Sequence, residues 1–416
     1  MPRAPKGAAL TTRCAIAGGG PAGVLLGYLL ARAGVDVVVL EKHADFFRDF
    51  RGDTVHPSTL EVMAELGLLD RFLARPHDEL DKISIEADGR LYLAAEFNRL
   101  PTRCRFIVFM PQWDFLDFLA DEGRKLPSFR LLMNAEVEGL VEEAGRVTGL
   151  EVRTRDGPLR VTADLVVGAD GRDSIVRDRA GLTVREYGAP IDVIWMRLSK
   201  RAGDQAATLG RIHRGRLLVT IDRGDYWQCA FLIRKGAFDA IRAGGLDKLR
   251  EEIAIAEPAF ADRLDEVTDW DQVKLLTVRV DRLEQWSRPG LLCIGDAAHA
   301  MSPVGGVGIN LAIQDAVAAA NRLAGPLLAG APSPEALAAV QARREWPTRV
   351  IQGFQVFVQD NILSCILGRD RPTPTWPFRL FRLIPPLRAL PARFIGQGPR
   401  PEHISPTLKR LFDRAA

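Results

Sequence analysis

The sequence predicts an α/β protein, in which a Rossmann-like nucleotide-binding domain is interleaved with a β-sheet domain and followed by a C-terminal helical segment. Three observations lead to this prediction. A strand, a glycine-rich turn, a helix and a second strand follow one another in residues 13–43. Two later apolar strands each break into a polar, glycine-containing turn, at residues 163–174 and 290–310. The stretches between these motifs show the alternation that is typical of β-strands.

The segment 13–43 predicts a dinucleotide-binding βαβ unit. It reads RCAIAGGGPAGVLLGYLLARAGVDVVVLEKH. Gly18 can take the tight turn, Gly20 lets backbone N–H groups approach a pyrophosphate, and Gly23 lets the helix lie close to the strand. The helix N-terminus adds partial positive charge, and an acidic residue ends the second strand, where it can accept hydrogen bonds from an adenosine ribose. The residues expected to bind the cofactor here are Gly18, Gly20, Pro21, Ala22, Gly23, Glu41 and Lys42.

Two further motifs indicate which dinucleotide binds. Residues 163–174, ADLVVGADGRDS, form a buried strand that ends in a polar turn. Residues 290–299, GLLCIGDAAH, repeat this design and continue through SPVGGVGIN, residues 302–310, into an alanine-rich helix. With the N-terminal fingerprint, these motifs resemble the three signatures of the FAD-dependent aromatic hydroxylases, the p-hydroxybenzoate hydroxylase-like, single-component class A flavoprotein monooxygenases. The resemblance covers about residues 10–330 and implies that the cofactor is FAD.

The third motif suits the flavin half of this cofactor. FAD is long, so one βαβ unit holds only its ADP half, and other parts of the chain must hold the ribityl chain and the isoalloxazine. A carboxylate after the strand can accept hydrogen bonds from ribityl hydroxyls, and the glycines let backbone N–H groups approach the pyrimidine edge. The helix that follows points its positive end at that edge, where reduced flavin carries negative charge. The residues concerned are Asp296, Gly306, Gly308, Ile309 and Asn310.

The resemblance implies further flavin contacts. Asp170 lies in the motif shared between FAD and the incoming nicotinamide cofactor, and Pro303 lies near the flavin C4a edge, where oxygen adds. Arg51, with Arg48 as the alternative, contacts the pyrophosphate. Gln112 matches a position that reaches the flavin from the other side. The alternative interpretation is that Gln112, together with Asp114, only caps the helix that Gln112 opens.

His56 has two interpretations. In related hydroxylases the stretch that corresponds to residues 52–61 passes the isoalloxazine before it enters a helix. The resemblance therefore implies that His56 faces the flavin and the substrate, and it makes His56 and Pro303 the candidate catalytic residues. An imidazole has a pKa that suits deprotonation of a phenol near neutral pH. Alternatively, His56 only precedes a helix that begins at Pro57.

The motifs imply a reaction. NADH or NADPH binds transiently and reduces FAD, the reduced flavin adds O2 to form a C4a-hydroperoxyflavin, and this species hydroxylates an aromatic or other electron-rich small molecule. The protein must keep water out of the pocket, because the peroxide otherwise collapses to H2O2. The sequence shows no second GxGxxG with its own strand and helix. This argues against a dedicated NADPH domain and therefore against the N-hydroxylating and Baeyer–Villiger classes.

Other flavoproteins share the first motif. A flavin-dependent halogenase needs a WxWxIP element, and no two tryptophans here lie two residues apart. An FAD-dependent prenyl reductase, or a quinone-pathway hydroxylase at the membrane surface, stays open because Phe378–Ile395 alternates arginines with apolar residues. The prolines of that stretch favour a lid packed on the protein. A non-catalytic FAD-binding sensor would keep the motifs and lack turnover.

Composition fits a large cytoplasmic enzyme. A chain of 416 residues, 47% of them hydrophobic, can bury two cores. A formal net charge of +3 does not indicate a nucleic-acid partner. Five cysteines without a CxxC pair indicate reduced thiols. We expect no signal peptide, no integral membrane segment and no metal site, and a monomer or a homodimer.

The order of the motifs predicts a discontinuous fold. The FAD-binding domain comprises residues 10–75, 105–185 and 285–330, the substrate-binding sheet domain residues 76–104 and 186–284, and the C-terminal helical or lid segment residues 331–416. A helix is expected near Glu335–Phe357. Alternation predicts the strands of the sheet domain at Ile83–Glu86, Val193–Leu198, Arg216–Ile221, Tyr226–Ile233 and Val273–Val280, with a hairpin turn at Asp222–Asp225.

Overall fold

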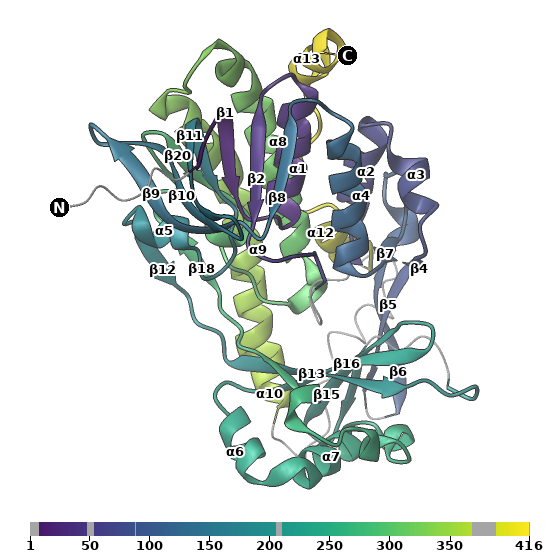
Figure 1. The fold of residues 1–416 in the computed structure, drawn as a ribbon. Coiled ribbons are helices and arrows are strands. Elements are labelled where there is room, and N and C mark those ends of the chain that lie inside the picture. The colour runs from purple at the N-terminus through teal and green to yellow at the C-terminus, as the bar shows by residue number, and fades with distance from the viewer. Residues whose placement is uncertain (1–7, 48–53, 88, 205–209, 368–387, 416) are drawn as a thin grey trace, which may run out of the picture.

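The computed structural model describes residues 8–47, 54–87, 89–204, 210–367 and 388–415. The chain folds into two bodies, each built around one sheet, with helices packed on both (Figure 1). The first body holds an eight-stranded sheet in the order β19-β20-β11-β1-β2-β8, and β10 and β9 extend it from β11. Its strands are β1 (Ala8–Ala17), β2 (Val37–Glu41), β8 (Phe129–Met133), β9 (Glu136–Glu143), β10 (Arg146–Thr154), β11 (Gly157–Gly168), β19 (Ser287–Arg288) and β20 (Leu291–Cys293).

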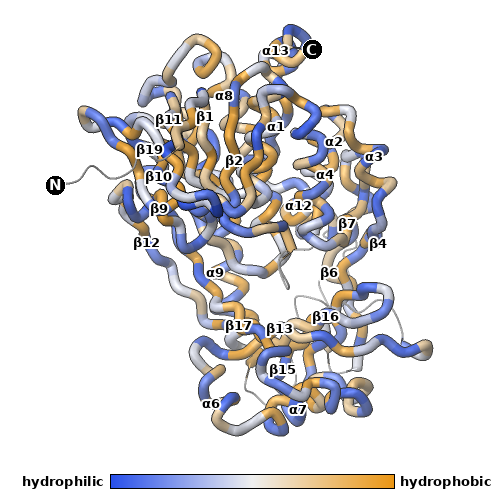
Figure 2. Tube along the Cα trace, in the orientation of Figure 1, coloured by the Kyte–Doolittle hydropathy of each residue, from blue (hydrophilic) through white to orange (hydrophobic). Residues whose placement is uncertain are grey.

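The centre of the first sheet is parallel. β20, β11, β1, β2 and β8 run in the same direction, and their residues are largely apolar, as Figure 2 shows for β1 and β2. Strands buried on both faces have this composition. Helix α1 (Pro21–Arg32) is almost wholly buried and packs against α8 (Gly308–Ala329) and α4 (Gln112–Arg124). The predicted Rossmann-like α/β fold is confirmed.

The second body holds a seven-stranded sheet in the order β17-β13-β16-β15-β14-β5-β6. One of its faces packs on helix α7 (Gly245–Ala256) through Trp227, Cys229 and Phe231, and the residues that alternate with these point to the other face. The strands are β5 (Lys82–Ala87), β6 (Arg90–Glu96), β13 (Ile191–Ser199), β14 (Gly210–His213), β15 (Arg216–Asp222), β16 (Tyr226–Arg234) and β17 (Lys274–Leu276).

Four of the five strands predicted for this sheet are confirmed, and the fifth is too long. The strand expected at Val273–Val280 forms only as Lys274–Leu276. Beyond Leu276, side chains form hydrogen bonds with the backbone groups that would otherwise pair with a neighbouring strand. The N–H of Val278 donates to Asp192 Oδ1 (3.0 Å), and its carbonyl accepts from Lys235 Nζ (2.7 Å). Buried polar side chains therefore end the strand, which alternation alone could not reveal.

The remaining helices and short strands complete the two bodies. The predicted helix at Glu335–Phe357 is α9 (Pro334–Val358), whose N-cap Ser333 accepts from the N–H of Ala336 (3.3 Å). The remaining helices are α2 (Pro57–Glu65), α3 (Leu69–Leu73), α5 (Ile175–Arg179), α6 (Phe238–Ala243), α10 (Ser364–Ile366), α12 (Ala389–Gly396) and α13 (Pro406–Ala415). Short strands are β3 (Thr54–Val55), β4 (Asp78–Leu80), β7 (Ile107–Phe109), β12 (Val184–Glu186) and β18 (Asp281–Leu283). The 3-10 helices are η1 (Phe97–Arg99), η2 (Pro258–Phe260), η3 (Leu264–Glu266), η4 (Trp270–Gln272), η5 (Gly295–Ala297) and η6 (Val304–Gly306). A short π-helix, η7 (Gln359–Leu363), follows α9.

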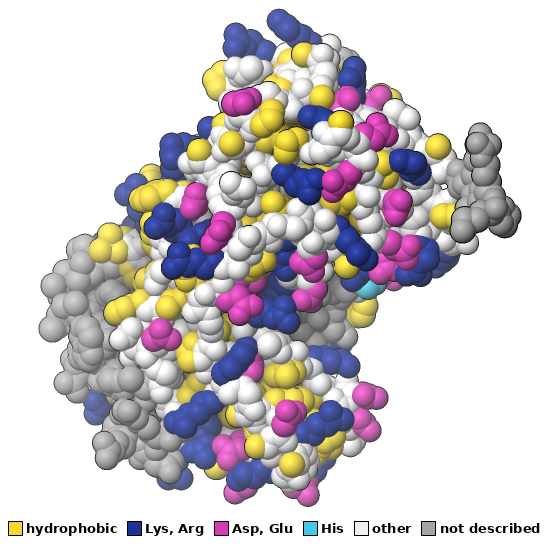
Figure 3. Space-filling view, turned by 90° about the vertical axis from the view of Figure 1, so that its left-hand side faces the viewer, with side chains coloured by type: hydrophobic (Ala, Val, Ile, Leu, Met, Phe, Trp, Pro, Cys, Tyr) yellow, Lys and Arg dark blue, Asp and Glu magenta, His cyan; other side chains and the backbone are white. Residues whose placement is uncertain are grey.

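The surface and the described helices agree with a balanced composition. On the face drawn in Figure 3, basic and acidic side chains lie interspersed. Among the described residues, no helix is long and apolar enough to cross a membrane. The same residues contain no cluster of three His, Cys, Asp or Glu side chains that could hold a metal ion. The described cysteines Cys14, Cys104, Cys229 and Cys293 are free and buried.

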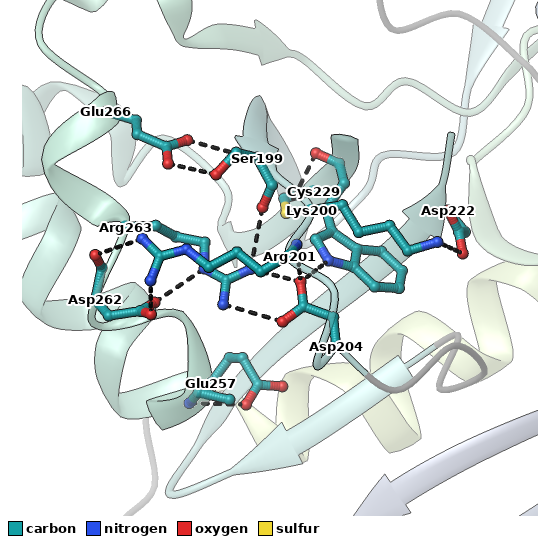
Figure 4. A network of polar contacts seen from close by, with 12 residues as sticks. Ser199, Lys200, Arg201, Asp204, Asp222, Cys229, Glu257, Asp262, Arg263 and Glu266 are labelled. Carbon is teal, nitrogen blue, oxygen red and sulfur yellow. Dashed lines mark hydrogen bonds and ion pairs between the residues drawn. The ribbon is translucent and has the colours of Figure 1, made fainter. Parts of the chain in front are cut away.

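A polar network anchors the segment that follows β13 in the second body (Figure 4). Arg263 is almost fully buried and donates to both carboxylate oxygens of Asp204, at 2.5 and 3.0 Å. Trp227 Nε1 donates to the same carboxylate (2.7 Å). The hydrogen bonds from Arg263 hold the pKa of Asp204 well below its usual range. The pair is bidentate and charge-assisted, which is the strong form of a side-chain hydrogen bond.

We expect Asp204→Asn to lower the free energy of unfolding by about 2–3 kcal/mol, because hydrogen bonds to charged groups contribute on this scale. Asp262→Asn is the matched control, since Asp262 contacts the same arginine but its side chain is half exposed. Urea unfolding at pH 7 compares the two variants. Equal losses in both would show that the buried geometry adds nothing to the pair.

Candidate functional site

The three sequence motifs meet at one edge of the first sheet. β1, β11 and β20 are parallel, so their carboxyl ends lie together. The N–H of Ala169 donates to the carbonyl of Ala17 (2.8 Å), and the N–H of Ile294 to that of Gly168 (2.9 Å). In α/β sheets, ligands bind beyond the carboxyl ends of the strands. This edge is therefore the candidate cofactor site.

The glycine-rich turn needs glycine at two positions for internal packing. Gly18 has φ +103°, and a Cβ on it would lie 2.3 Å from the carbonyl oxygen of Ala169. A Cβ on Gly23 would lie 2.0 Å from the carbonyl oxygen of Gly18. Real Cβ atoms do not approach so closely. The first and third glycines thus let β1, β11 and α1 come together, as the motif predicts.

Gly20 differs from both. No described heavy atom beyond its chain neighbours lies within 4 Å of the place where its Cβ would stand. Gly20 is the N-cap of α1, Pro21 is the first helical residue, and the first turn carries no acidic side chain. Open space, backbone N–H groups and the positive end of a helix dipole are what a pyrophosphate requires. The described residues here fit the phosphates of FAD.

Glu41 is held at the end of β2. Its Oε2 accepts from the N–H of Gly19 (3.0 Å) and its Oε1 from the N–H of His43 (3.0 Å). A carboxylate has lone pairs for more than two hydrogen bonds. Its place beside the glycine turn suits the predicted contact with the ribose. Lys42 follows it and is exposed.

The second motif is organised by its own carboxylate. Asp170 Oδ1 accepts from Ser174 Oγ (2.5 Å), and its Oδ2 accepts from the N–H of Val176 (3.1 Å). Burial raises the pKa of Asp170. The side chain therefore holds the turn from the strand into α5. The neighbouring Arg172 Nε lies 3.2 Å from Asp296 Oδ2, so it joins the second motif to the third, and the Asp296 side chain is about one-third exposed.

The third motif forms the loop that connects β20 to α8. Gly295 has φ +60°, and a Cβ on it would lie 3.2 Å from Ala22 Cβ, so the loop packs on the first turn of α1. Gly306 has φ +63° and lies against Thr54, where a Cβ would be 2.7 Å from Oγ1. Pro303 is partly buried and its carbonyl accepts from the N–H of Gly306 (3.0 Å).

The start of α8 is tied to the start of α2. Gly308 is its first residue, and Ile309 is half-buried. Asn310 is buried, and its Oδ1 accepts from Ser58 Oγ (2.6 Å) and Thr59 Oγ1 (3.1 Å). The sequence analysis did not find this link, because the partners are 251 and 252 residues apart.

His56 is fully buried, and both ring nitrogens face backbone carbonyls. Nδ1 lies 2.9 Å from the carbonyl oxygen of Ile395, and Nε2 lies 3.0 Å from that of Gly306. Nε2 also lies 3.3 Å from Thr54 Oγ1. Burial lowers the pKa of His56 to about 4, against the opposing effect of the two carbonyls. In this conformation His56 joins the third-motif loop to α12, and its catalytic role stays a prediction.

The pKa of His56 predicts how stability depends on pH. The folded value is about 4 and the unfolded value is near 6.5, so the unfolded chain binds more protons between them. The contribution is present above about pH 6.5 and is lost as the pH falls towards 4, by at most about 1.4 kcal/mol per pH unit. His56→Gln removes the titration and keeps one donor and one acceptor. Urea unfolding at pH 7, 6 and 5 should show a flatter dependence for the variant, and parallel curves would contradict the prediction.

Two other predicted contacts have different outcomes. Gln112 is the first residue of α4 and is half-buried. The helix has Pro111 as its N-cap and shows no side-chain capping bond within the described structure, so the capping interpretation of Gln112 is wrong. Its approach to the flavin stays a prediction. Arg51 and its alternative Arg48 lie outside the described residues.

The structure adds a buried charged network that the motifs did not reveal. Asp315 of α8 accepts from the N–H of Gly295 (3.0 Å) and contacts His299 Nε2 (2.6 Å). Arg344 of α9 donates from Nε to Asp315 Oδ1 (3.0 Å), and its Nη1 lies 3.3 Å from Glu402 Oε1. A charged residue inside the alanine-rich stretch after the third motif was the available signal. The network fixes the third-motif loop, which we also call the flavin loop, to α8, α9 and the C-terminal segment.

Comparisons with known proteins place the chain in a family. A family model for an FAD binding domain matches residues 11–353. A 6-methylpretetramide 4-monooxygenase from Streptomyces rimosus is 35% identical over 365 residues, which are 87% of each protein. A rifampicin monooxygenase from Streptomyces venezuelae is 28% identical over 322 residues, and the match spans 72% of this chain and 61% of that protein.

Solved structures agree in fold. An anhydrotetracycline hydroxylase from Streptomyces rimosus superposes with a TM-score of 0.74 at 23% identity, over 93% of this chain and 76% of that one. A p-nitrophenol 4-monooxygenase from Pseudomonas putida gives 0.71 at 20% identity, over 98% and 97%. These likenesses concern the fold. Because the family model and the first relative both span most of the sequence, the chain belongs to the FAD-dependent aromatic hydroxylases and is an FAD-dependent monooxygenase.

Proposed function

We propose that the protein uses NADH or NADPH and O2 to hydroxylate a phenolic compound of the aromatic polyketide class. The observation that carries this proposal is the 35% identity over 87% of both chains to an enzyme that is named for its action on 6-methylpretetramide. In the balanced reaction, one oxygen atom of O2 enters the ring and the other leaves as water. NAD(P)H supplies the two electrons and the second proton comes from solvent.

The second sheet supports a flat aromatic substrate. On the face opposite α7, Val193 of β13 pairs with Leu232 of β16, and Ala230 of β16 pairs with Val219 of β15, so apolar side chains lie side by side on three strands. Val304 of the third-motif loop packs against the cluster that these residues form. Trp195 and Val219 belong to the same face and are only partly buried. An apolar face that reaches the flavin loop can stack a planar ring and exclude water from it.

The chain's own residues take separate parts in this proposal. The N-terminus of α1 binds the phosphates, Glu41 accepts from the ribose, and the loop between Asp296 and Asn310 lies along the flavin. Bound FAD would carry electrons from the nicotinamide to O2 and transfer one oxygen atom to the substrate. Pro303, together with the apolar sheet face, would keep the reacting ring in place. His56 is retained as a catalytic candidate, and proton transfer at its ring would require one nitrogen to leave the carbonyl of Gly306 or Ile395 that it faces in this structure.

A turnover experiment tests the proposal. Purified, FAD-loaded protein is mixed with NADH or NADPH under ¹⁸O2, with 6-methylpretetramide or simpler phenols as candidate substrates. We expect substrate to stimulate nicotinamide oxidation and one ¹⁸O atom to appear in the product by mass spectrometry. Stimulated oxidation without labelled product, or labelling from H2¹⁸O in place of O2, would overturn it.

A further inference from the structure

Helix α9 turns its polar residues inward. Figure 1 shows it running from the first body to the second. Its buried side includes Gln352 and Gln355, and the buried Gln359 follows in the π-helix η7. Phe354 and Phe357, on the other side of α9, are exposed. A surface helix normally shows the opposite pattern. Buried amides are costly unless their hydrogen bonds are made, so this face must have specific partners.

Those partners belong to the third-motif loop. Gln355 Nε2 donates to the carbonyls of Ser302 (2.9 Å) and Val304 (2.9 Å). Its Oε1 accepts from the N–H of Ser302 (3.2 Å). One side-chain amide thus satisfies both backbone groups of Ser302, as a neighbouring strand would do. Gln359 Nε2 donates to Ser302 Oγ.

The third glutamine holds the beginning of the same loop. Gln352 Nε2 donates to the carbonyls of Ala300 (3.0 Å) and Asp281 (2.6 Å). The N–H of Ala300 donates to Asp281 Oδ1 (3.1 Å), and the carbonyl of Ala300 also accepts from the N–H of Asp281 (3.3 Å), so backbone and side-chain bonds both join the two segments. Gln352 Oε1 accepts from Arg282 Nη1 (2.8 Å). Residues 300–303 belong to no helix or strand. Side chains of α9 bond the N–H and the carbonyl of Ser302 and share the carbonyl of Ala300 with the N–H of Asp281, so they supply part of what a ladder would otherwise supply.

We propose that Gln352, Gln355 and Gln359 are positioning residues, which set the place of the loop around Pro303 and thereby the place of the flavin. All three glutamines lie C-terminal to the three sequence motifs, the last of which ends at residue 310. The inference rests on the proposed course of the flavin along this loop. Val358 at the end of α9, Leu363 of η7 and Ile366 of α10 pack in the cluster that contains Val193 of the second sheet. The segment formed by α9, η7 and α10 therefore contacts both the flavin loop and the sheet proposed to hold the substrate, and it fixes their relative position.

The test compares two glutamines of α9. Gln355→Leu removes the clamp on Ser302. Gln341→Leu is the matched control, because Gln341 clamps another backbone segment through the carbonyl of Glu284 (2.9 Å) and the N–H of Trp286 (2.9 Å). The FAD-loaded proteins are examined for thermal stability, for the visible absorption band of the flavin and for the dissociation constant of FAD.

We expect both variants to lose some thermal stability. Only Gln355→Leu should shift the flavin band and raise the FAD dissociation constant, by roughly 2- to 12-fold, the range expected when the loss of one of its three hydrogen bonds is passed on to FAD binding. If Gln355→Leu does not fold, Gln355→Met keeps the length of the side chain and removes the amide, and the same shift is expected. Identical flavin spectra and affinities in the Gln341 and Gln355 variants would overturn the proposal. These readouts need only bound FAD, so they are independent of whether 6-methylpretetramide is hydroxylated.

Discussion

Replacing Arg344 by methionine is expected to lower the free energy of unfolding by about 3–5 kcal/mol, which is typical when one partner of a buried ion pair is removed. Arg344 and Asp315 are both fully buried, and the guanidinium Nε donates to Asp315 Oδ1 at 3.0 Å. The variant leaves the carboxylate with His299 and the N–H of Gly295 only. Because Gly295 belongs to the flavin loop, FAD should also be released more readily. Urea unfolding at pH 7 and flavin fluorescence on dilution measure the two effects.

Arg343→Met is the control for this change. Arg343 contacts Glu402 (2.6 Å), but its side chain is partly exposed and does not reach Asp315. We expect a loss of about 1 kcal/mol or less, because the Arg343 side chain is partly exposed and the buried Glu402 keeps Arg344 as its partner. Similar losses in the two variants would mean that the charge on Asp315 needs no arginine.

The same pair predicts a response to acid. Burial opposes the ionisation of Asp315, but the charges and hydrogen bonds of His299 and Arg344 outweigh it and lower the pKa. A carboxyl with a lowered folded pKa contributes stability above its unfolded value, near 3.9, and this contribution is lost as the pH falls further. In Arg344→Met burial meets less opposition, so the variant should lose less stability than the parent below about pH 4. Equal losses on acidification would contradict this assignment.

Gly20→Ala is expected to weaken FAD binding by about 5- to 150-fold, without a comparable change in the stability of the apoprotein. The added methyl meets no described protein atom within 4 Å, and the φ of −75° at this residue suits alanine. It does occupy the space proposed for the pyrophosphate, where overpacking costs about 1–3 kcal/mol. FAD titration of the apoprotein, followed by flavin fluorescence, measures the affinity, and thermal unfolding measures the fold.

Gly23→Ala separates this effect from general damage. Its methyl would lie 2.0 Å from the carbonyl oxygen of Gly18, so α1 must move and the apoprotein itself should melt at a lower temperature. An unchanged FAD affinity in Gly20→Ala would place the phosphates away from the N-terminus of α1. A destabilised Gly20→Ala apoprotein would show that the open space is filled by the chain.

The βαβ unit at residues 13–43 could be predicted from sequence because its geometry depends on residues close together in the chain. A strand, a helix and three glycines at fixed spacing determine a short-range geometry, and Gly18 and Gly23 have the conformations or contacts that such a unit requires. The helix of residues 334–358 was also predictable, because its length and capping residue are local signals. The strand at residues 273–280 was overestimated for the converse reason, since its end depends on Asp192, which is distant in sequence.

The sequence by itself determined the Rossmann-like unit and the order of the motifs, since each motif consists of residues within a few positions of one another, and the resemblance of the three motifs together indicated the cofactor. Only the tertiary structure decided the partners of His56, which are backbone carbonyls 250 and 339 residues away. It also decided the orientation of α9, because helical periodicity assigns polar residues to solvent, whereas Gln355 is buried against Ser302. Hydrogen-bond partners distant in the chain leave no periodic signal, so their energy acts only after the fold has brought them together.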